Sequence, residues 1–287
     1  MMKLMLAVGA FGVAGLMTPA PAAHAQGNTS KDFVPPTVFQ AAGPTAASIQ
    51  GAVDEYRAAL GNPDNGNASG LPSGLPTGHR EINWDGGSKT NQTTVVAGNP
   101  FTGFLVTRGA LFTTPDGTGF VQAPPTADPV LFPPGGLAGL FGNPSYGTIF
   151  AAFSPLRLFS PIQGKITEVD FFVPGGGNIP ATTTGFGAVF TDVDRPDGSG
   201  PGTKRGNRKA STLIEYFGAD NHLLFSSFVP ASPGDASLSF FGIVFDDARI
   251  ARVRITSGSV APGPDDDGKH DVVMMDDFLY GEPQPLQ

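Results

Sequence analysis

From Glu81 onward, short apolar stretches alternate with clusters of turn-forming residues. In the segment 251–255, which reads ARVRI, valine and isoleucine alternate with two arginines. A period of two puts the apolar side chains on one face of a strand and the charged ones on the other. About ten such stretches, separated by Gly, Pro and Asp, predict an all-β fold. We expect a two-sheet antiparallel β-sandwich of jelly-roll type.

The expected strands are short and are separated by these turn-forming residues. They cover residues 81–85, 103–108, 110–114, 119–122, 148–153, 157–159, 165–173, 186–193, 212–217, 223–229, 237–245, 249–256 and 272–280. The segments 123–147 and 195–210 show no period and are expected to be long loops, which are usually functional or mobile.

The composition supports a folded chain. Its 287 residues include 40 Gly and 28 Pro, but also 23 Phe, and only 15% are charged. Disorder requires low hydrophobicity and high charge, so this composition favours a folded chain. A single β domain of about 200 residues fits the usual size range. The chain has no cysteine, which excludes disulfides and thiolate chemistry. Bound calcium is a common alternative way to stabilise an exported protein of this kind.

Residues 1–25 are expected to form a signal peptide. Lys3 supplies the positive charge, residues 4–17 the apolar region, and Ala-His-Ala at 23–25 the cleavage site. The alternative is a membrane anchor, but the apolar run is short for a span and prolines follow it. We therefore predict a secreted protein, periplasmic or extracellular, without a membrane span after cleavage.

Removal of Lys3 changes the formal net charge from -8 to -9. Nucleic-acid binding needs a basic surface, so this charge disfavours it. Residues 26–80 are expected to form an N-terminal helical segment and a Gly/Pro-rich linker. Residues 81–282 would be the β-sandwich, and residues 283–287 a C-terminal tail.

Residues 45–60 predict a helix. Four apolar side chains recur at helical spacing, namely Ile49, Val53, Tyr56 and Leu60, and a glycine follows. An amphipathic helix must bury its apolar stripe, so we expect it to dock on the sandwich.

The segment 271–280, DVVMMDDFLY, places Asp276 and Asp277 side by side in an apolar strand. Because neighbouring strand residues point to opposite faces, one of the two is expected to face inward or toward a rim of the sheet. A buried carboxylate must be paired or bound to a metal. The alternatives are a metal ligand and a hydrogen-bonded carboxylate at the rim.

A second acidic stretch runs from Asp192 through Asp194 to Asp197-Gly198 and is similar to a DxDxDG calcium loop. Its spacing is longer by one residue and the final Glu is missing, so it is not an EF-hand. It predicts either an irregular calcium site using Asp192 or Asp194, or an acidic turn at a strand end. The run 265–267 of three aspartates is expected to be a solvated turn.

Several short motifs carry a resemblance over about two-thirds of the chain. They are Ile82-Asn83-Trp84-Asp85-Gly86, Arg108-Gly109, Phe153-Ser154-Pro155, Gly185-Phe186-Gly187, Phe190-Thr191-Asp192-Val193-Asp194 and Met275-Asp276-Asp277-Phe278. They resemble a group of exported bacterial proteins without an assigned function. The last motif also resembles the final strand of calcium-binding jelly-roll carbohydrate-binding modules. The resemblance implies a structural calcium held by Asp277 or Asp276 together with Asp85 near the first strand.

Sugar sites combine an aromatic face with polar hydrogen-bonding groups. Trp84, the single tryptophan, could be a sugar platform or a core residue. Tyr146, in a Gly/Pro/Ser-rich loop, is expected to be the most exposed aromatic ring. These two are the candidate ligand-binding residues.

The sequence gives little support for catalysis, because it contains no G-x-S-x-G, H-E-x-x-H or phosphate-binding motif. The leading hypothesis is a secreted, non-enzymatic binding or surface module, stabilised by calcium, with a glycan or matrix polymer as its partner. The alternatives are a polysaccharide hydrolase or lyase on the same sandwich, and a purely structural extracellular matrix protein.

Overall fold

The computed structural model describes residues 34–71, 73–86, 90–194, 212–263, 265–267 and 269–286. The expected signal peptide and the whole of the expected 195–210 loop, which includes Asp197-Gly198, lie outside these residues.

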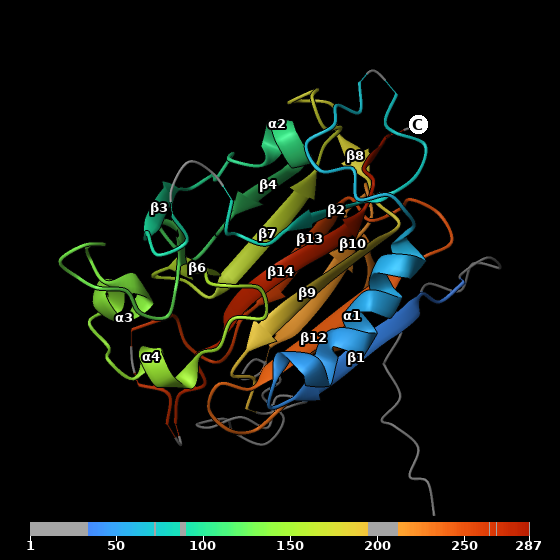
Figure 1. Cartoon of the computed structure of the whole chain (residues 1–287). Helices are drawn as coiled ribbons and strands as arrows, with labels where there is room; N and C mark the ends of the chain where they lie inside the picture. The colour runs from blue at the N-terminus through green and yellow to red at the C-terminus, as the bar shows by residue number, and fades with distance from the viewer. Residues whose placement is uncertain are drawn as a thin grey trace, which may run out of the picture.

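Two antiparallel sheets pack face to face (Figure 1), which confirms the predicted all-β sandwich. The strand order of the larger sheet is β1 (Thr37–Gly43), β12 (Leu238–Val244), β9 (Gly185–Thr191), β14 (Met274–Gly281), β6 (Leu158–Ile162), β5 (Gly119–Ala123) and β3 (Val95–Gly98), and β2 (His79–Ile82) also pairs with β14. The smaller sheet has the order β11 (Leu223–Phe228), β10 (Leu213–Phe217), β13 (Arg252–Thr256), β7 (Ile166–Phe171) and β4 (Ala110–Thr113). The short strands β8 (Ala181–Thr182) and β15 (Gln284–Pro285) pair separately.

The main core lies between the two sheets and is rich in phenylalanine. Strand β13 shows how the sequence pattern places it there: Val253 and Ile255 are fully buried in this core. The arginines at 252 and 254 lie on the other face and both pair with Glu168 of β7, at 2.9 and 2.5 Å. The period of two therefore predicted both faces of this strand.

Helix α1 (Ala46–Leu60) covers the outer face of the larger sheet (Figure 1), as predicted. Its four stripe residues are buried against a separate cluster that includes Val189, Phe240 and Leu279. The Tyr56 hydroxyl reaches the sheet and donates a hydrogen bond to the Ile243 carbonyl at 3.2 Å. The helix is thus a third layer.

Strand β1 belongs to the larger sheet and pairs along its whole length with β12. The sheet thus includes residues from before position 81, where we expected the sandwich to begin. Part of the expected linker is also tied to the domain. The Asn65 N–H donates to the carbonyl of His79, the first residue of β2, and the His79 N–H donates to the Pro63 carbonyl, at 2.9 and 3.0 Å.

Three short helices lie where the sequence predicted strands or loops: α2 (Leu105–Arg108), α3 (Gly136–Phe141) and α4 (Tyr146–Ile149). The expected strand 103–108 was wrong because Gly109 adopts a left-handed conformation that ends a helical turn there. The expected strand 148–153 was also wrong, since none of its residues is in a strand and α4 covers its start. Asn143 forms the turn before this helix by accepting hydrogen bonds from the Ser145 N–H and hydroxyl.

Candidate metal centre

A β-bulge in β14 determines how Asp276 and Asp277 are placed. Met275 pairs with Phe190 of β9 and Phe278 with Ala188, so two residues of β14 lie opposite one residue of β9. Met275 and Phe278 both point into the core between the sheets. Both aspartates therefore project from the outer face, and the expectation that the two would point to opposite faces was wrong.

The two carboxylates are buried and hydrogen-bonded. Asp276 accepts hydrogen bonds from the N–H groups of Phe153 at 2.6 Å and Ser154 at 3.3 Å. Asp277 accepts one from the Ser154 hydroxyl at 2.5 Å and lies 3.8 Å from the Arg57 guanidinium of α1. Burial, followed by the charge of its neighbour, raises the pKa of Asp276. Burial also raises the pKa of Asp277, against the lowering effect of Ser154.

Asp85 contacts the same short segment from the other side. Its carboxylate accepts hydrogen bonds from the N–H groups of Leu156 at 2.6 Å and Arg157 at 2.9 Å. Strand β2, just before Asp85, pairs with β14. The first and last parts of the predicted sandwich thus meet, but the carboxylates of Asp85 and Asp276 are directed at backbone N–H groups.

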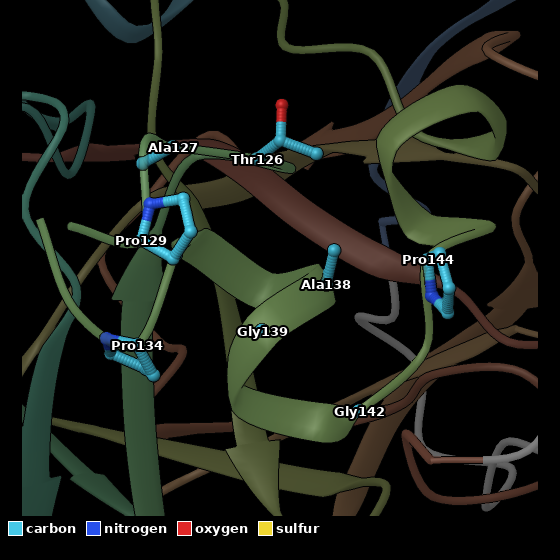
Figure 2. A pocket seen from close by; sticks show the side chains of 9 residues that line it. Thr126, Ala127, Pro129, Pro134, Ala138, Gly139, Gly142 and Pro144 are labelled. Atoms are coloured by element: carbon cyan, nitrogen blue, oxygen red, sulfur yellow. The ribbon is translucent and has the colours of Figure 1, made fainter.

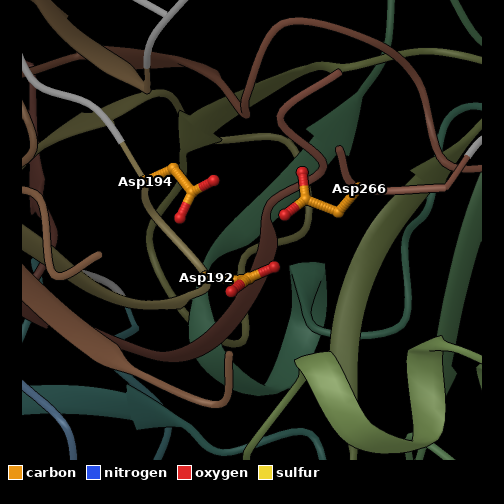
Figure 3. Close-up of side chains that lie close together, drawn as sticks. All are labelled: Asp192, Asp194 and Asp266. Atoms are coloured by element: carbon orange, nitrogen blue, oxygen red, sulfur yellow. The ribbon is translucent and has the colours of Figure 1, made fainter. Parts of the chain in front are cut away.

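A different set of carboxylates is close enough to hold one cation. Asp192, Asp194 and Asp266 each offer a carboxylate oxygen within 4.8 Å of the other two (Figure 3), and this is the single such group of three among the described residues. Asp192 and Asp194 were predicted as metal ligands, whereas Asp276, Asp277 and Asp85 are not part of this group.

The neighbouring strands β9 and β14 bring the three aspartates together. Thr191, the last residue of β9, pairs with Met274, the first residue of β14. The chain leaving β9 and the chain entering β14 therefore meet at one end of the larger sheet. Asp192 follows Thr191 in a left-handed conformation with φ of 68°. Asp266 is held in the loop before β14, where it accepts a hydrogen bond from the Val272 N–H at 3.1 Å.

Asp192 is the unusual member of the group. Its side chain is almost entirely buried, with 1% of the residue exposed. Among the described residues, no N–H or hydroxyl group donates to its carboxyl oxygens, and the group that faces them within hydrogen-bonding reach is the Asp266 carboxyl. Burial, followed by the charge of Asp266, raises the pKa of Asp192 to about 9. Burial raises the pKa of Asp266 to about 6, although the hydrogen bond from the Val272 N–H lowers it. A cation between these oxygens would supply a positive charge that the described residues around them do not.

Asp266 was not among the predicted metal ligands, because a run of three aspartates before a glycine is usually a solvated turn. Asp266 is in fact only partly exposed and faces Asp192. The signal that could have found it was the pairing of β9 with β14. Strand pairing of this kind is not visible in the local pattern of either segment.

The two candidate sugar-binding rings are in the interior. Trp84 is 1% exposed and stacks on Phe159, and its indole N–H donates to the Asp276 carbonyl at 3.1 Å. It is a core residue, which was one of the two alternatives for it. Tyr146 is fully buried, and its hydroxyl accepts a hydrogen bond from the Gly263 N–H at 2.7 Å. The expectation that Tyr146 would be exposed was wrong, because α4 turns the ring under the 260–263 loop.

Comparisons with family models, with curated proteins and with solved structures gave no match. Among the described residues, no helix is both long enough and apolar enough to span a bilayer.

Proposed function

We propose that this protein is an exported, non-enzymatic binding or surface module whose β-sandwich is stabilised by calcium. One observation carries the proposal: the buried Asp192 carboxyl lies beside those of Asp194 and Asp266, and no N–H or hydroxyl group of the described residues donates to it. A buried carboxyl in this situation is neutralised either by a proton, as its raised pKa in the metal-free protein reflects, or by a cation that displaces the proton. The two carboxylates beside it favour the cation, because one ion can neutralise all three groups.

The donor set favours calcium over other common metals. All three side chains offer carboxylate oxygens, and no His takes part in the group. Hard oxygen donors suit calcium and magnesium, whereas zinc and copper prefer nitrogen and sulfur. Calcium accepts about six to eight oxygens in variable geometry. Such tolerance suits three aspartates that come from two loops rather than from one regular motif.

The role in stability follows from where the site lies. Asp192 and Asp194 follow β9, and Asp266 precedes β14, so a cation would join two segments that are far apart in the sequence. The protein has no disulfide to do this. A glycan or matrix polymer remains the partner that the sequence resemblance favours, but Trp84 and Tyr146 are buried and are not proposed as its contacts.

Thermal unfolding with calcium, with magnesium and with chelator tests the proposal. A cation that binds only the folded state stabilises it by about 2.7 kcal/mol at a hundredfold excess over its Kd. We expect chelation to lower the melting temperature and calcium to restore it. Asp247→Asn is a suitable control, since Asp247 is an exposed partner of Arg249, and this variant should keep the full calcium response. An identical melting curve with calcium and with chelator would contradict the proposal.

A glycan array tests the partner separately. We expect binding of one class of polymer, and loss of that binding in chelator if calcium holds the domain in its binding form. Release of shortened or unsaturated sugars from a bound polymer would instead favour the hydrolase or lyase alternative.

A further inference from the structure

The most exposed apolar side chains of the described residues form a small projection that we call the apolar tip, residues Val130 and Leu131. They are 85% and 70% exposed. The tip belongs to a stretch from 129 to 156 that contains no Asp, Glu, Lys, Arg or His. Exposed apolar side chains in a charge-free region are typical of an interaction surface.

The tip is held in a defined conformation. The N–H groups of Val130 and Leu131 donate to the Asp128 carboxylate at 2.8 and 3.3 Å, and the Phe132 N–H donates to the Asp128 carbonyl at 2.7 Å. A turn fixed in this way keeps both apolar side chains in water. Such an arrangement favours burial against a partner, because little conformational entropy is lost on binding.

A groove lies beside the tip (Figure 2). Its volume is 440 Å³, and it is lined by small or apolar residues: Thr126, Ala127, Pro129, Pro134, Gly135, Ala138, Gly139, Gly142 and Pro144. None of these side chains is charged, and Pro129, which precedes the tip, forms part of the wall. The same segment therefore presents an apolar projection and an apolar hollow side by side.

We propose that this surface binds a second copy of the chain, with the tip of each copy in the groove of the other. A two-fold interface requires a patch that is complementary to itself, and an adjacent projection and hollow meet that requirement. Charge points to the same partner. Each copy carries a formal charge of -9 without Lys3. Two copies therefore meet with least repulsion through the stretch 129–156, which has no charged residue, and the adjoining Asp128 carboxylate is held by the N–H groups of the tip.

A lipid bilayer is the weaker choice of partner. The stretch 129–156 offers no Lys or Arg for lipid headgroups, and a bilayer would leave the groove without a matching side chain. The proposal is independent of the calcium site, although self-association would favour the structural matrix alternative for the biological role.

Sedimentation velocity over a wide range of protein concentration tests the proposal on residues 26–287, the chain expected after signal cleavage. We expect concentration-dependent dimers. Leu131→Asp should weaken dimerisation by about tenfold or more, because it places a charge in an apolar contact. Val106→Asp is the matched control. Like Leu131, Val106 is an exposed apolar residue, but it lies on α2, so its change should leave dimerisation as it was.

A second variant tests the groove itself. Ala138→Leu narrows the hollow without adding charge, and we expect it to weaken dimerisation as well; unchanged or stronger dimerisation would contradict the tip-in-groove arrangement. Melting curves check that each variant is folded. A chain that is monomeric at every concentration overturns the proposal. Binding of a monomeric chain to phosphatidylcholine vesicles, abolished by Leu131→Asp, would identify lipid as the partner and also overturn it.

Discussion

Gly187 and Gly242 are direct partners in the ladder between β9 and β12, and together they form the floor on which the Tyr56 ring of α1 rests. A Cβ atom at Gly187 would lie 2.8 Å from the Tyr56 ring, and one at Gly242 would lie 2.9 Å from it. The paired glycines therefore let the helix approach the sheet closely enough for the Tyr56 hydroxyl to reach the Ile243 carbonyl.

Alanine at either glycine is expected to destabilise the protein by about 1–3 kcal/mol, because the ring must move away from a packed surface. Gly98→Ala is the control, since a Cβ there meets no atom within 4 Å. Chemical denaturation measures the difference. In a Tyr56→Leu background the loss at Gly187 should shrink, because the two changes share one contact. Equal losses in both backgrounds would contradict the contact between the paired glycines and the Tyr56 ring.

Asp192→Asn is expected to affect stability in opposite directions with and without calcium. In chelator the variant should be more stable than the native protein, by about 1–3 kcal/mol, because it removes a buried carboxylate without a donor. In calcium it should respond much less than the native protein. Melting curves in the two conditions measure both effects. A variant that keeps the full calcium response would show that Asp192 is not a ligand.

Ser154→Ala is expected to destabilise the protein by about 1–3 kcal/mol, since the Asp277 carboxylate then loses its hydroxyl donor in a buried position. Ser227→Ala is the control, because the Ser227 hydroxyl donates only to the carbonyl of the next residue. Denaturation of both variants at neutral pH provides the comparison. Similar losses for the two serines would contradict a special role for Ser154 at the bulge.

His79 makes stability depend on pH near neutrality. Its ring nitrogens face the Gly61 carbonyl at 2.6 Å and the Glu81 carboxylate at 3.0 Å, both of which are acceptors. Burial lowers the pKa of His79, but the hydrogen bonds to Glu81 and Gly61 outweigh burial and raise it overall. The imidazolium is therefore favoured in the folded state, and it joins the end of α1 to β2.

Because the folded-state pKa is raised, the stabilisation from His79 is fully present below its ordinary pKa of about 6.5. It is lost as the pH rises through the folded-state value. We expect His79→Gln to be less stable than the native protein at pH 6, and this deficit to shrink as the pH is raised. A deficit that stays constant over this range would contradict the assignment. His222→Gln is the comparison: Asp220 also raises the pKa of this exposed histidine, but solvent screens the pair, so we expect a much smaller deficit.

Local patterns predicted those parts of the fold that depend on which face of an element is buried. The stripe at Ile49, Val53, Tyr56 and Leu60 and the alternation in β13 each specify a buried face without reference to any other segment. The bulge at Asp276 could not be predicted in this way, because it exists only relative to β9. For the same reason Asp266 could not be predicted as a ligand, because its neighbours Asp192 and Asp194 follow β9, which is distant in the sequence. Trp84 and Tyr146 show a related limit: an aromatic residue near a turn has the same local sequence whether its ring points out or in.

The position of β14 has a consequence for how the protein is made. This strand is formed by residues 274–281 of 287, yet it lies in the interior of the larger sheet, hydrogen-bonded to β9, β6 and β2. A ribosome makes β2 and β9 well before this central strand emerges. Until then β9 and β2 lack their common neighbour, and the growing polypeptide cannot reach its native topology. The larger sheet is thereby completed only once residues 274–281 have been made, so the earlier strands depend on a late segment for their native pairing.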